Sequence, residues 1–369
     1  MGDAQQAVQD VLDELVTDGV EQGVQVAAFV DGAMVVDAVT GVADPATGRK
    51  VQPDTVFYNF SIGKGAMATL VHQQVDAGAF GYDTPVAQLW PEFARHGKQA
   101  ITVRQVLDHT AGVPGLPPDS TIDSITDWTA MVAALEDAEP WWEPGTKVGY
   151  HAYTFGYLAG EIVRRATGRP LAQVLRDDLA APIGHPDEIW FGMPESARGS
   201  LAVLTDAPSD VDWSAMGIPP DDPVFRAAPP AVFPTAELGN DPRVIGADIP
   251  AGGKVSARAL ARMYASLLGE VDGVRLLSAE RFREATTVSS SGPDQVYGDE
   301  SSWGLGWAAG VPWDEQARSV FGMAGAGGSW AGVDLDRGLA FAVTKNVLSM
   351  DFDALTRVGR TLLAELDRG

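Results

Sequence analysis

The 369-residue sequence contains no cysteine. This absence excludes disulfide bonds, thiolate metal sites and a cysteine nucleophile. Histidine is also scarce, and the five histidines show neither a His-Glu-x-x-His pattern nor another tight ligand spacing. We therefore expect no metal and no other cofactor, and a chemistry that depends on hydroxyls, amines, imidazoles and carboxylates.

Basic residues are few, because 26 lysines and arginines stand against 50 acidic residues and leave a formal net charge of −24. A surface of this sign repels nucleic acids and anionic membranes, so neither is an expected partner. No apolar run reaches the roughly 18–20 residues that a membrane helix needs. The first residues lack the basic and apolar regions of a secretory signal, which predicts a cytoplasmic protein.

Motifs for nucleotide binding are also missing. The phosphate-binding pattern Gly-x-x-x-x-Gly-Lys-Ser/Thr does not occur. GLGWAA at 304–309 has the glycine spacing of a dinucleotide fingerprint, but no helical pattern follows it and Pro312 interrupts the chain. The sequence therefore does not indicate a nucleotide cofactor.

What the sequence does contain is typical of a globular fold, with 45% hydrophobic and 21% charged residues. An amphipathic helix opens the chain, and Asp31-Gly32 between two apolar runs predicts a hairpin. Helical patterns and strand patterns alternate with turns in the remainder. We expect helices at 61–77, 101–109, 125–138, 154–167, 256–271 and 353–367, and strands at 318–325, 327–335 and 338–346.

Strand patterns near both ends of the chain enclose a mainly helical middle, which predicts an α+β fold with an inserted helical domain. We place the discontinuous sheet domain at 1–80 and 250–369, and the helical domain at 81–249. Residues 194–249 are rich in Pro, Asp and Ala and have only weak periodicity, so we expect an irregular excursion over the surface there.

The stretch SIGK places Ser61 and Lys64 three residues apart at the start of a helical pattern. Residues at i and i+3 share a helix face, so the lysine amine can lie next to the serine hydroxyl. If that face is buried, desolvation lowers the lysine pKa and lets a neutral amine accept the serine proton. The same spacing also fits a solvated serine at a helix start with a surface lysine.

Two further stretches carry candidate functional residues. Tyr150 precedes a helix, so its phenol either projects from a loop into a cleft or packs with a satisfied hydroxyl. The stretch FGMAGAGGSW at 321–330 has glycines where a strand edge lets another group approach closely.

Taken together and in this order, the three stretches resemble the serine β-lactamase-like family, in particular class C β-lactamases, DD-peptidases and family VIII carboxylesterases. SIGK stands at that family's Ser-x-x-Lys motif, YHA at its tyrosine motif and MAG at its Lys-Thr-Gly or His-x-Gly motif. ITVRQVLDHTAGVPG, SARALARMYASLL and WGLGW add to the resemblance, which extends from about residue 20 to residue 350.

The resemblance implies an antiparallel sheet flanked by the terminal helices, an inserted mostly helical domain, and an active site between them. It implies that Ser61 is the acylated nucleophile and that Lys64 and Tyr150 share the general-base and general-acid work. The oxyanion hole would consist of the backbone N–H groups of Ser61 and Ala326.

Five further residues near these motifs are candidates for substrate binding. Met323 stands where the family normally has Lys, His or sometimes Trp, and a thioether cannot pair with a substrate carboxylate. Gly325 belongs to the same motif. Trp307 and Trp330 either line an apolar acyl pocket or fill cores. His151 either tunes its neighbour Tyr150 or is structural.

These residues favour a carboxylesterase-type hydrolase that forms an acyl-enzyme on Ser61 from a small ester, thioester or amide. A transacylase that passes the acyl group to an amine or alcohol in small-molecule biosynthesis uses the same groups and stays open. A weak β-lactamase and a non-catalytic binding protein on the same fold are further alternatives. Nothing in the sequence fixes the oligomeric state.

Overall fold

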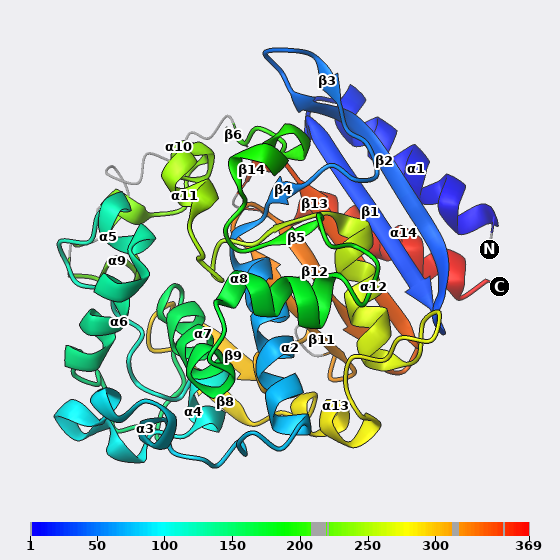
Figure 1. Ribbon diagram of the computed structural model, residues 1–369. Coiled ribbons are helices and arrows are strands. Elements are labelled where there is room, and N and C mark those ends of the chain that lie inside the picture. The colour runs from blue at the N-terminus through cyan, green and yellow to red at the C-terminus, as the bar shows by residue number, and fades with distance from the viewer. Residues whose placement is uncertain (1, 208–218, 220, 312–316, 350, 369) are drawn as a thin grey trace.

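The computed structural model describes residues 2–207, 219, 221–311, 317–349 and 351–368. Its centre is an antiparallel sheet of nine strands in the order β3-β2-β1-β13-β12-β11-β10-β9-β8 (Figure 1). These strands are β1 (Gly23–Val30), β2 (Ala33–Asp44), β3 (Arg49–Lys50), β8 (Ser290–Pro293), β9 (Glu300–Trp303), β10 (Ala308–Ala309), β11 (Val320–Gly325), β12 (Ser329–Asp334) and β13 (Leu339–Lys345).

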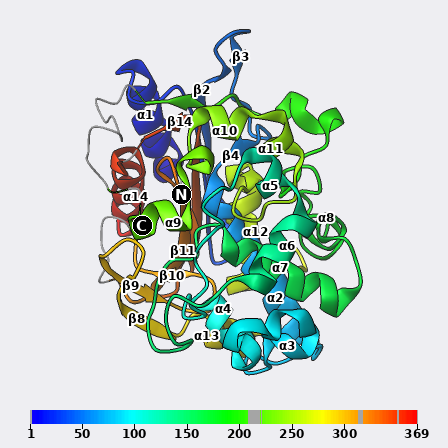
Figure 2. The ribbon, with the colours of Figure 1, turned by 90° about the vertical axis from the view of Figure 1, so that its left-hand side faces the viewer.

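Helices cover both faces of this sheet (Figure 2). The terminal helices α1 (Gly2–Thr17) and α14 (Asp353–Leu366) pack together on one face, and α12 (Ala257–Leu268) packs on the other. The other helices are α2 (Gly63–Asp76), α3 (Val86–Leu89), α4 (Val103–Leu107), α5 (Ile122–Thr126), α6 (Trp128–Asp137), α7 (Thr154–Thr167), α8 (Leu171–Val174), α9 (Pro223–Ala227), α10 (Ala236–Asn240), α11 (Pro242–Gly246) and α13 (Ala279–Ala285). The predicted α+β class, with an antiparallel sheet between terminal helices and a helical part, is confirmed.

The expected elements are present, with two differences. The hairpin between β1 and β2 turns at Asp31 and Gly32, whose φ angles of 48° and 80° are those of the favoured two-residue turn. The helix expected at 125–138 is divided, because Asp127 ends α5 and caps the start of α6 through Ala130 N. Strands β8, β9 and β10 were not expected, since β8 and β9 are short and serine-rich and β10 consists of only two alanines, so none of them shows an apolar alternation.

Two small sheets connect distant segments. In the first, β7 (Lys254–Val255) pairs with both β4 (Phe57–Tyr58) and β5 (Ile189–Trp190). It therefore crosses the predicted boundary between the sheet domain (1–80 and 250–369) and the helical domain (81–249), and that division stays a prediction. In the second, β6 (Thr205–Asp206) pairs with β14 (Val347–Leu348).

The segment 194–249 contains more regular structure than its composition suggested. Three short helices, α9, α10 and α11, begin at side-chain caps supplied by Asp222, Thr235 and Asp241. The part of this segment at 208–218 and 220 lies outside the described residues. Within the described chain, no helix is long and apolar enough to cross a membrane.

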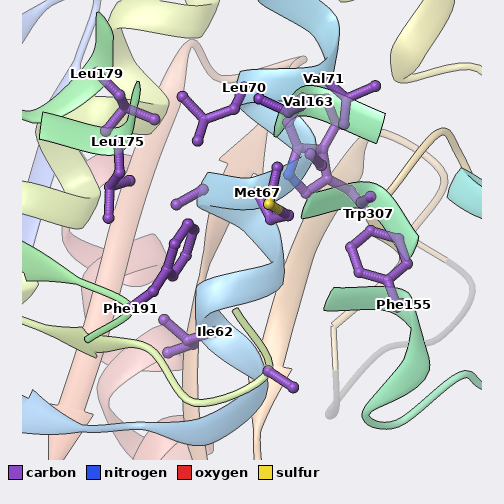
Figure 3. Close-up of a cluster of buried hydrophobic side chains, with 14 of the residues drawn as sticks. Ile62, Met67, Leu70, Val71, Phe155, Val163, Leu175, Leu179, Phe191 and Trp307 are labelled. Atoms are coloured by element: carbon purple, nitrogen blue, oxygen red, sulfur yellow. The ribbon is translucent and has the colours of Figure 1, made fainter. Parts of the chain in front are cut away.

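Helix α2 runs through the middle of the main core, between the sheet and the helical part (Figure 3). Its residues from Gly63 to His72 are all buried, so it has no solvent-facing side along this stretch. Met67 lies beside Trp307 and Val71 lies beside Val163 of α7, whereas Leu70 is on the side of Leu175 and Leu179. A second core lies beneath the terminal helices α1 and α14 and includes Val8, Leu12, Leu15, Val358 and Leu362.

The start of α2 touches the 250–253 loop backbone to backbone. A Cβ added to Gly63 would lie 2.4 Å from Pro250 O and 2.8 Å from the Cα of Gly253. Neither group can give way by rotating a side chain, so both glycines are needed for this contact. The contact fixes the start of α2, where the candidate nucleophile lies, against the loop before β7.

We predict that Gly63→Ala lowers the free energy of unfolding by about 1–3 kcal/mol, the usual cost of adding atoms to a close-packed site. Gly199→Ala is the matched control, because a Cβ at Gly199 meets no atom within 4 Å and the backbone there tolerates a side chain. Urea denaturation of the two variants measures the difference. Equal losses in both would contradict the proposed contact.

Candidate active site

Ser61 lies in a short 3₁₀ turn, Phe60–Ile62, that leads directly into α2. Phe60 has a φ of 47°, a left-handed conformation that residues other than glycine seldom adopt. Two backbone hydrogen bonds hold this turn: Asn59 N donates to Gly253 O at 2.8 Å, and Gly253 N donates to Phe60 O at 2.9 Å. The turn thus places Ser61 at the wall of a pocket rather than in the core.

Lys64 follows on the same side of the helix start, as its spacing predicted. Its Nζ atom lies 2.6 Å from Ser61 Oγ, and its side chain is fully buried. Burial lowers the pKa of Lys64 well below the ordinary value of a lysine. A neutral amine in hydrogen-bond contact with the hydroxyl can therefore accept its proton.

Tyr150 completes the arrangement around the hydroxyl. Its side chain is hydrogen-bonded to Ser61, and the Lys64 Nζ atom lies 4.8 Å from the centre of its ring. Burial raises the pKa of Tyr150, and the hydrogen bond between Tyr150 and Ser61 only partly opposes this effect. The phenol therefore keeps its proton and is suited to donate it. The structure brings together the three residues that were predicted to be catalytic.

Tyr150 is held by residues that the sequence did not indicate. Its backbone N–H donates to Asp294 Oδ2 at 2.9 Å, and the same buried carboxylate accepts from the N–H groups of Val296 and Tyr297. The ring of Trp303 stacks on Tyr150 with centres 5.5 Å apart and an angle of 13° between planes. Asp294 lies 144 residues along the chain from Tyr150, and no local pattern marks it.

His151 does not reach the pocket. Its Nδ1 lies 2.7 Å from Gly149 O and its Nε2 lies 3.1 Å from Val113 N, so the proton is on Nδ1 and both ring nitrogens are satisfied. Burial lowers its pKa to about 4, which leaves the ring neutral. The histidine whose ring contacts Tyr150 is instead His109, at 5.0 Å between ring centres. His151 acts on this region by donating its backbone N–H to His109 Nδ1.

The end of β11 forms the opposite wall of the pocket, and Met323, Gly325 and Ala326 all line it. A Cβ added to Gly325 would lie 2.1 Å from Asn59 O, so only glycine allows β11 to approach the turn before Ser61 this closely. Asn59 in turn accepts a hydrogen bond from Ser329 Oγ. These contacts fix the distance between the two segments that carry Ser61 and Ala326. The role of their backbone N–H groups as the oxyanion hole stays a prediction.

The pocket has a volume of about 560 Å³ and a mainly apolar lining. Besides the residues already named, its walls include Phe60, Tyr153, Val224, Phe233, Leu348 and Phe352. The described residues that line it include no lysine or arginine. In the described part of the chain, no three histidine or acidic side chains are grouped so that they could hold a metal ion.

The two tryptophans proposed for the acyl pocket are not among its lining residues. Trp307 is 1% exposed and packs beside α2, with its ring centre 4.8 Å from that of His72 (Figure 3). Trp330 is also 1% exposed and packs against Phe341 in the core beneath α1 and α14. Successive strand residues point to opposite faces, so nearness to a motif in sequence did not place Trp330 on the pocket side. Both residues pack in hydrophobic cores, which is the second of the two positions that the sequence allowed for them.

Comparisons with known proteins agree with this geometry. The model of the family described as Beta-lactamase matches residues 8–365. The esterase/beta-lactamase LipL of Mycobacterium tuberculosis (strain ATCC 25618 / H37Rv) is 34% identical over 350 residues, which cover 88% of this chain and 77% of LipL.

Solved structures are similar over almost the full length. A family VIII carboxylesterase is 30% identical with a TM-score of 0.88, over 98% of this chain and 97% of that one. A penicillin-binding protein homologue from Caulobacter crescentus is 34% identical with a TM-score of 0.84, over 98% and 96% of the two chains. The protein belongs to the beta-lactamase family of serine enzymes.

Proposed function

We propose that the protein is a carboxylesterase-type hydrolase that cleaves small esters or amides through an acyl-enzyme on Ser61. The observation that carries the proposal is a fully buried lysine amine 2.6 Å from a serine hydroxyl at the wall of an apolar pocket. Burial lowers the pKa of this amine well below that of an ordinary lysine, which favours the uncharged form that can act as a base.

In the proposed reaction, Lys64 takes the proton of Ser61 Oγ as this atom attacks the substrate carbonyl. The backbone N–H groups of Ser61 and Ala326 stabilise the resulting oxyanion. Tyr150 donates its proton to the leaving alcohol or amine and recovers it from the Lys64 ammonium, which leaves an acyl group on Ser61. Water then attacks the acyl-enzyme by the reverse sequence of proton transfers and releases the acid.

The lining of the pocket favours an uncharged substrate. Met323 offers no positive charge, and no lysine or arginine is found among the described lining residues. A substrate carboxylate, such as that of a β-lactam, would lose its hydration there without gaining an ion pair. The relatives named esterase or carboxylesterase also favour an ester as the substrate. A weak β-lactamase activity is an alternative.

One observation favours a second candidate, a transacylase. Apolar side chains such as Phe60, Phe233 and Phe352 surround the acyl site, and an apolar alcohol or amine would gain more than water from entering it. Lys64 and Tyr150 can assist the attack of water and of an alcohol or amine equally well. The cytoplasm is the proposed location. A non-catalytic binding protein is a further alternative, which the first experiment below tests.

We expect Ser61→Ala to abolish turnover of p-nitrophenyl butyrate and labelling by a fluorophosphonate probe. Both processes need the activated hydroxyl, so intact-mass spectrometry should find a single adduct on the wild-type protein and none on the variant. Ser200→Ala, which removes a hydroxyl that donates to Ala197 O outside the pocket lining, is the control and should label normally. Absence of an adduct and of nitrophenol from the wild type would leave a binding protein.

The pH dependence of kcat/KM should report the titration of Lys64. Because burial lowers its pKa well below 10.5, the active unprotonated amine forms at lower pH than in an ordinary lysine, and the rate should rise with pH and level off well before pH 10.5. Lys64→Met should reduce kcat/KM by roughly 10²–10⁴-fold, the contribution of a general base. The exposed Lys147→Met is the control. A rate that still climbs at pH 10 would contradict a buried amine as the base.

Product analysis separates the two acceptors. With p-nitrophenyl butyrate as donor and n-butanol as competing acceptor, a hydrolase should release nitrophenol at a rate independent of butanol and yield mainly butyric acid. Butyl butyrate as the main product, with faster nitrophenol release when deacylation is limiting, would identify a transacylase. Gas chromatography of the products, with Ser61→Ala as blank, makes the measurement.

A further inference from the structure

The two residues on either side of Tyr150 both form hydrogen bonds with one residue, His109. The Gly149 N–H donates to His109 O at 3.1 Å, and the His151 N–H donates to His109 Nδ1 at 3.1 Å. The ring of His109 also contacts the ring of Tyr150, with centres 5.0 Å apart. The reaction proposed above assigns no role to His109.

The hydrogen bond from His151 determines the protonation state of the His109 ring. A backbone N–H can only donate, so Nδ1 is the accepting nitrogen and the proton of the neutral ring lies on Nε2. An imidazolium carries donors on both nitrogens and would lose this bond. Burial lowers the pKa of His109 well below its ordinary value, and His151 and Lys64 lower it further, which agrees with a neutral ring.

The backbone of His109 has an unusual conformation. Its φ angle is 61°, a left-handed conformation that residues other than glycine seldom adopt, and the residue is fully buried. Such strain persists only where the surrounding structure over-determines the conformation, and it is frequent at active sites. Here the carbonyl oxygen and the ring of the same residue both accept hydrogen bonds from the segment 149–151.

The turn that carries His109 is itself attached to the sheet. Asp108 is 4% exposed, and its Oδ2 atom accepts a hydrogen bond from Ser289 Oγ at 2.7 Å. Its backbone oxygen accepts from Ser290 Oγ at 2.6 Å. Ser290 begins β8, the strand that leads to Asp294. The two residues that hold the backbone around Tyr150, Asp294 and His109, are therefore connected through β8.

The ring of His109 also restricts the phenol of Tyr150. It meets the ring of Trp303 edge-on, with centres 4.2 Å apart and an angle of 64° between planes. Trp303 in turn stacks on Tyr150. The phenol thus contacts two rings that contact each other, and loss of the imidazole would leave a space beside it into which it could move.

We propose that His109 is a positioning residue that holds Tyr150 in place to give its proton to the leaving group. This inference rests on the proposed function, in which Tyr150 is the acid. His109 is not among the described lining residues of the pocket, and its Nδ1 atom is occupied by the His151 N–H. It therefore acts through Tyr150 and not on the substrate.

The test uses the leaving group, because a misplaced acid does not affect all esters equally. p-Nitrophenolate is a stable anion that leaves without a proton, whereas p-methylphenolate gains from protonation as the bond breaks. The measured quantity is the ratio of kcat/KM for p-nitrophenyl butyrate to kcat/KM for p-methylphenyl butyrate. A smaller amount of folded enzyme lowers both values and leaves this ratio unchanged.

Tyr150→Phe removes the acid, so it should raise the ratio and serves as the reference. We expect His109→Leu to raise the ratio about 10-fold, which is less than the roughly 10²-fold loss that a displacement of about 1 Å can cause.

Two milder substitutions separate the hydrogen bond from the bulk of the ring. His109→Asn should keep a ratio close to that of the wild type, because Asn tolerates a positive φ and its Oδ1 atom can take the place of Nδ1 as the acceptor for the His151 N–H. His109→Gln keeps a polar side chain, but its amide reaches only the place of Nε2. It should therefore raise the ratio.

His72→Leu is the matched control. His72 is also a fully buried histidine, but its ring nitrogens lie 2.7 Å from Tyr82 Oη and 2.8 Å from Leu305 O, away from the segment 149–151. This variant should lower the melting temperature and keep the wild-type ratio. Thermal denaturation checks that each variant is folded.

A wild-type ratio in both His109→Leu and His109→Gln would overturn the inference. The same holds for a ratio in His109→Asn as high as that in His109→Gln, and for an unchanged ratio in Tyr150→Phe. Turnover that survives in Ser61→Ala would instead overturn the proposed function. A Ser61-dependent enzyme in which only Tyr150→Phe raises the ratio would refute the role of His109 alone, so the two failures are distinguishable.

Discussion

A lysine amine buried beside a serine hydroxyl is the constraint on which this structure depends. An ammonium ion is costly to bury without a carboxylate, so Lys64 is tolerated in its site mainly in the uncharged form. Its neighbours are neutral for the same reason: burial lowers the pKa of His109 and raises that of Tyr150. Burial thus favours the neutral forms of the two side chains in contact with Ser61, and the N–H groups of the pocket wall can stabilise the charge that develops on the substrate during the reaction.

The surroundings of α2 explain how this burial is achieved. The helix is enclosed on all sides for its first ten residues, and glycines at Gly63 and Gly65 allow close approach by the 250–253 loop and by Tyr264. From the other side, Gly325 brings β11 against Asn59. Water is therefore excluded from the lysine, while Ser61, at the very start of the helix, still reaches the pocket. The same packing that stabilises the core sets the protonation state of the base.

Local patterns in the sequence predicted the parts of the site that depend on local geometry. The spacing of Ser61 and Lys64 fixes their contact within one helical turn, and the Asp31-Gly32 turn fixes the first hairpin. Tyr150 required the resemblance to a family, because its approach to Ser61 depends on tertiary packing. Asp294 carries no local signal, since its partner Tyr150 lies in a distant segment of the chain. Trp330 does not line the pocket because its side chain is on the other face of the sheet, and Trp307, which lies between β9 and β10, packs beside α2 instead.

The two halves of the pocket differ in how they are attached to the fold. The nucleophile and its base belong to α2 and the turn that leads into it, which the main core encloses, whereas Val224, Phe233 and Leu348 belong to short segments at the periphery of that core. Hydrogen exchange and local opening in proteins follow such differences, because peripheral segments open without unfolding the core. Evolution can therefore exchange the substrate-facing walls at little cost in stability, while any change to the reacting pair is coupled to the folding of the whole molecule.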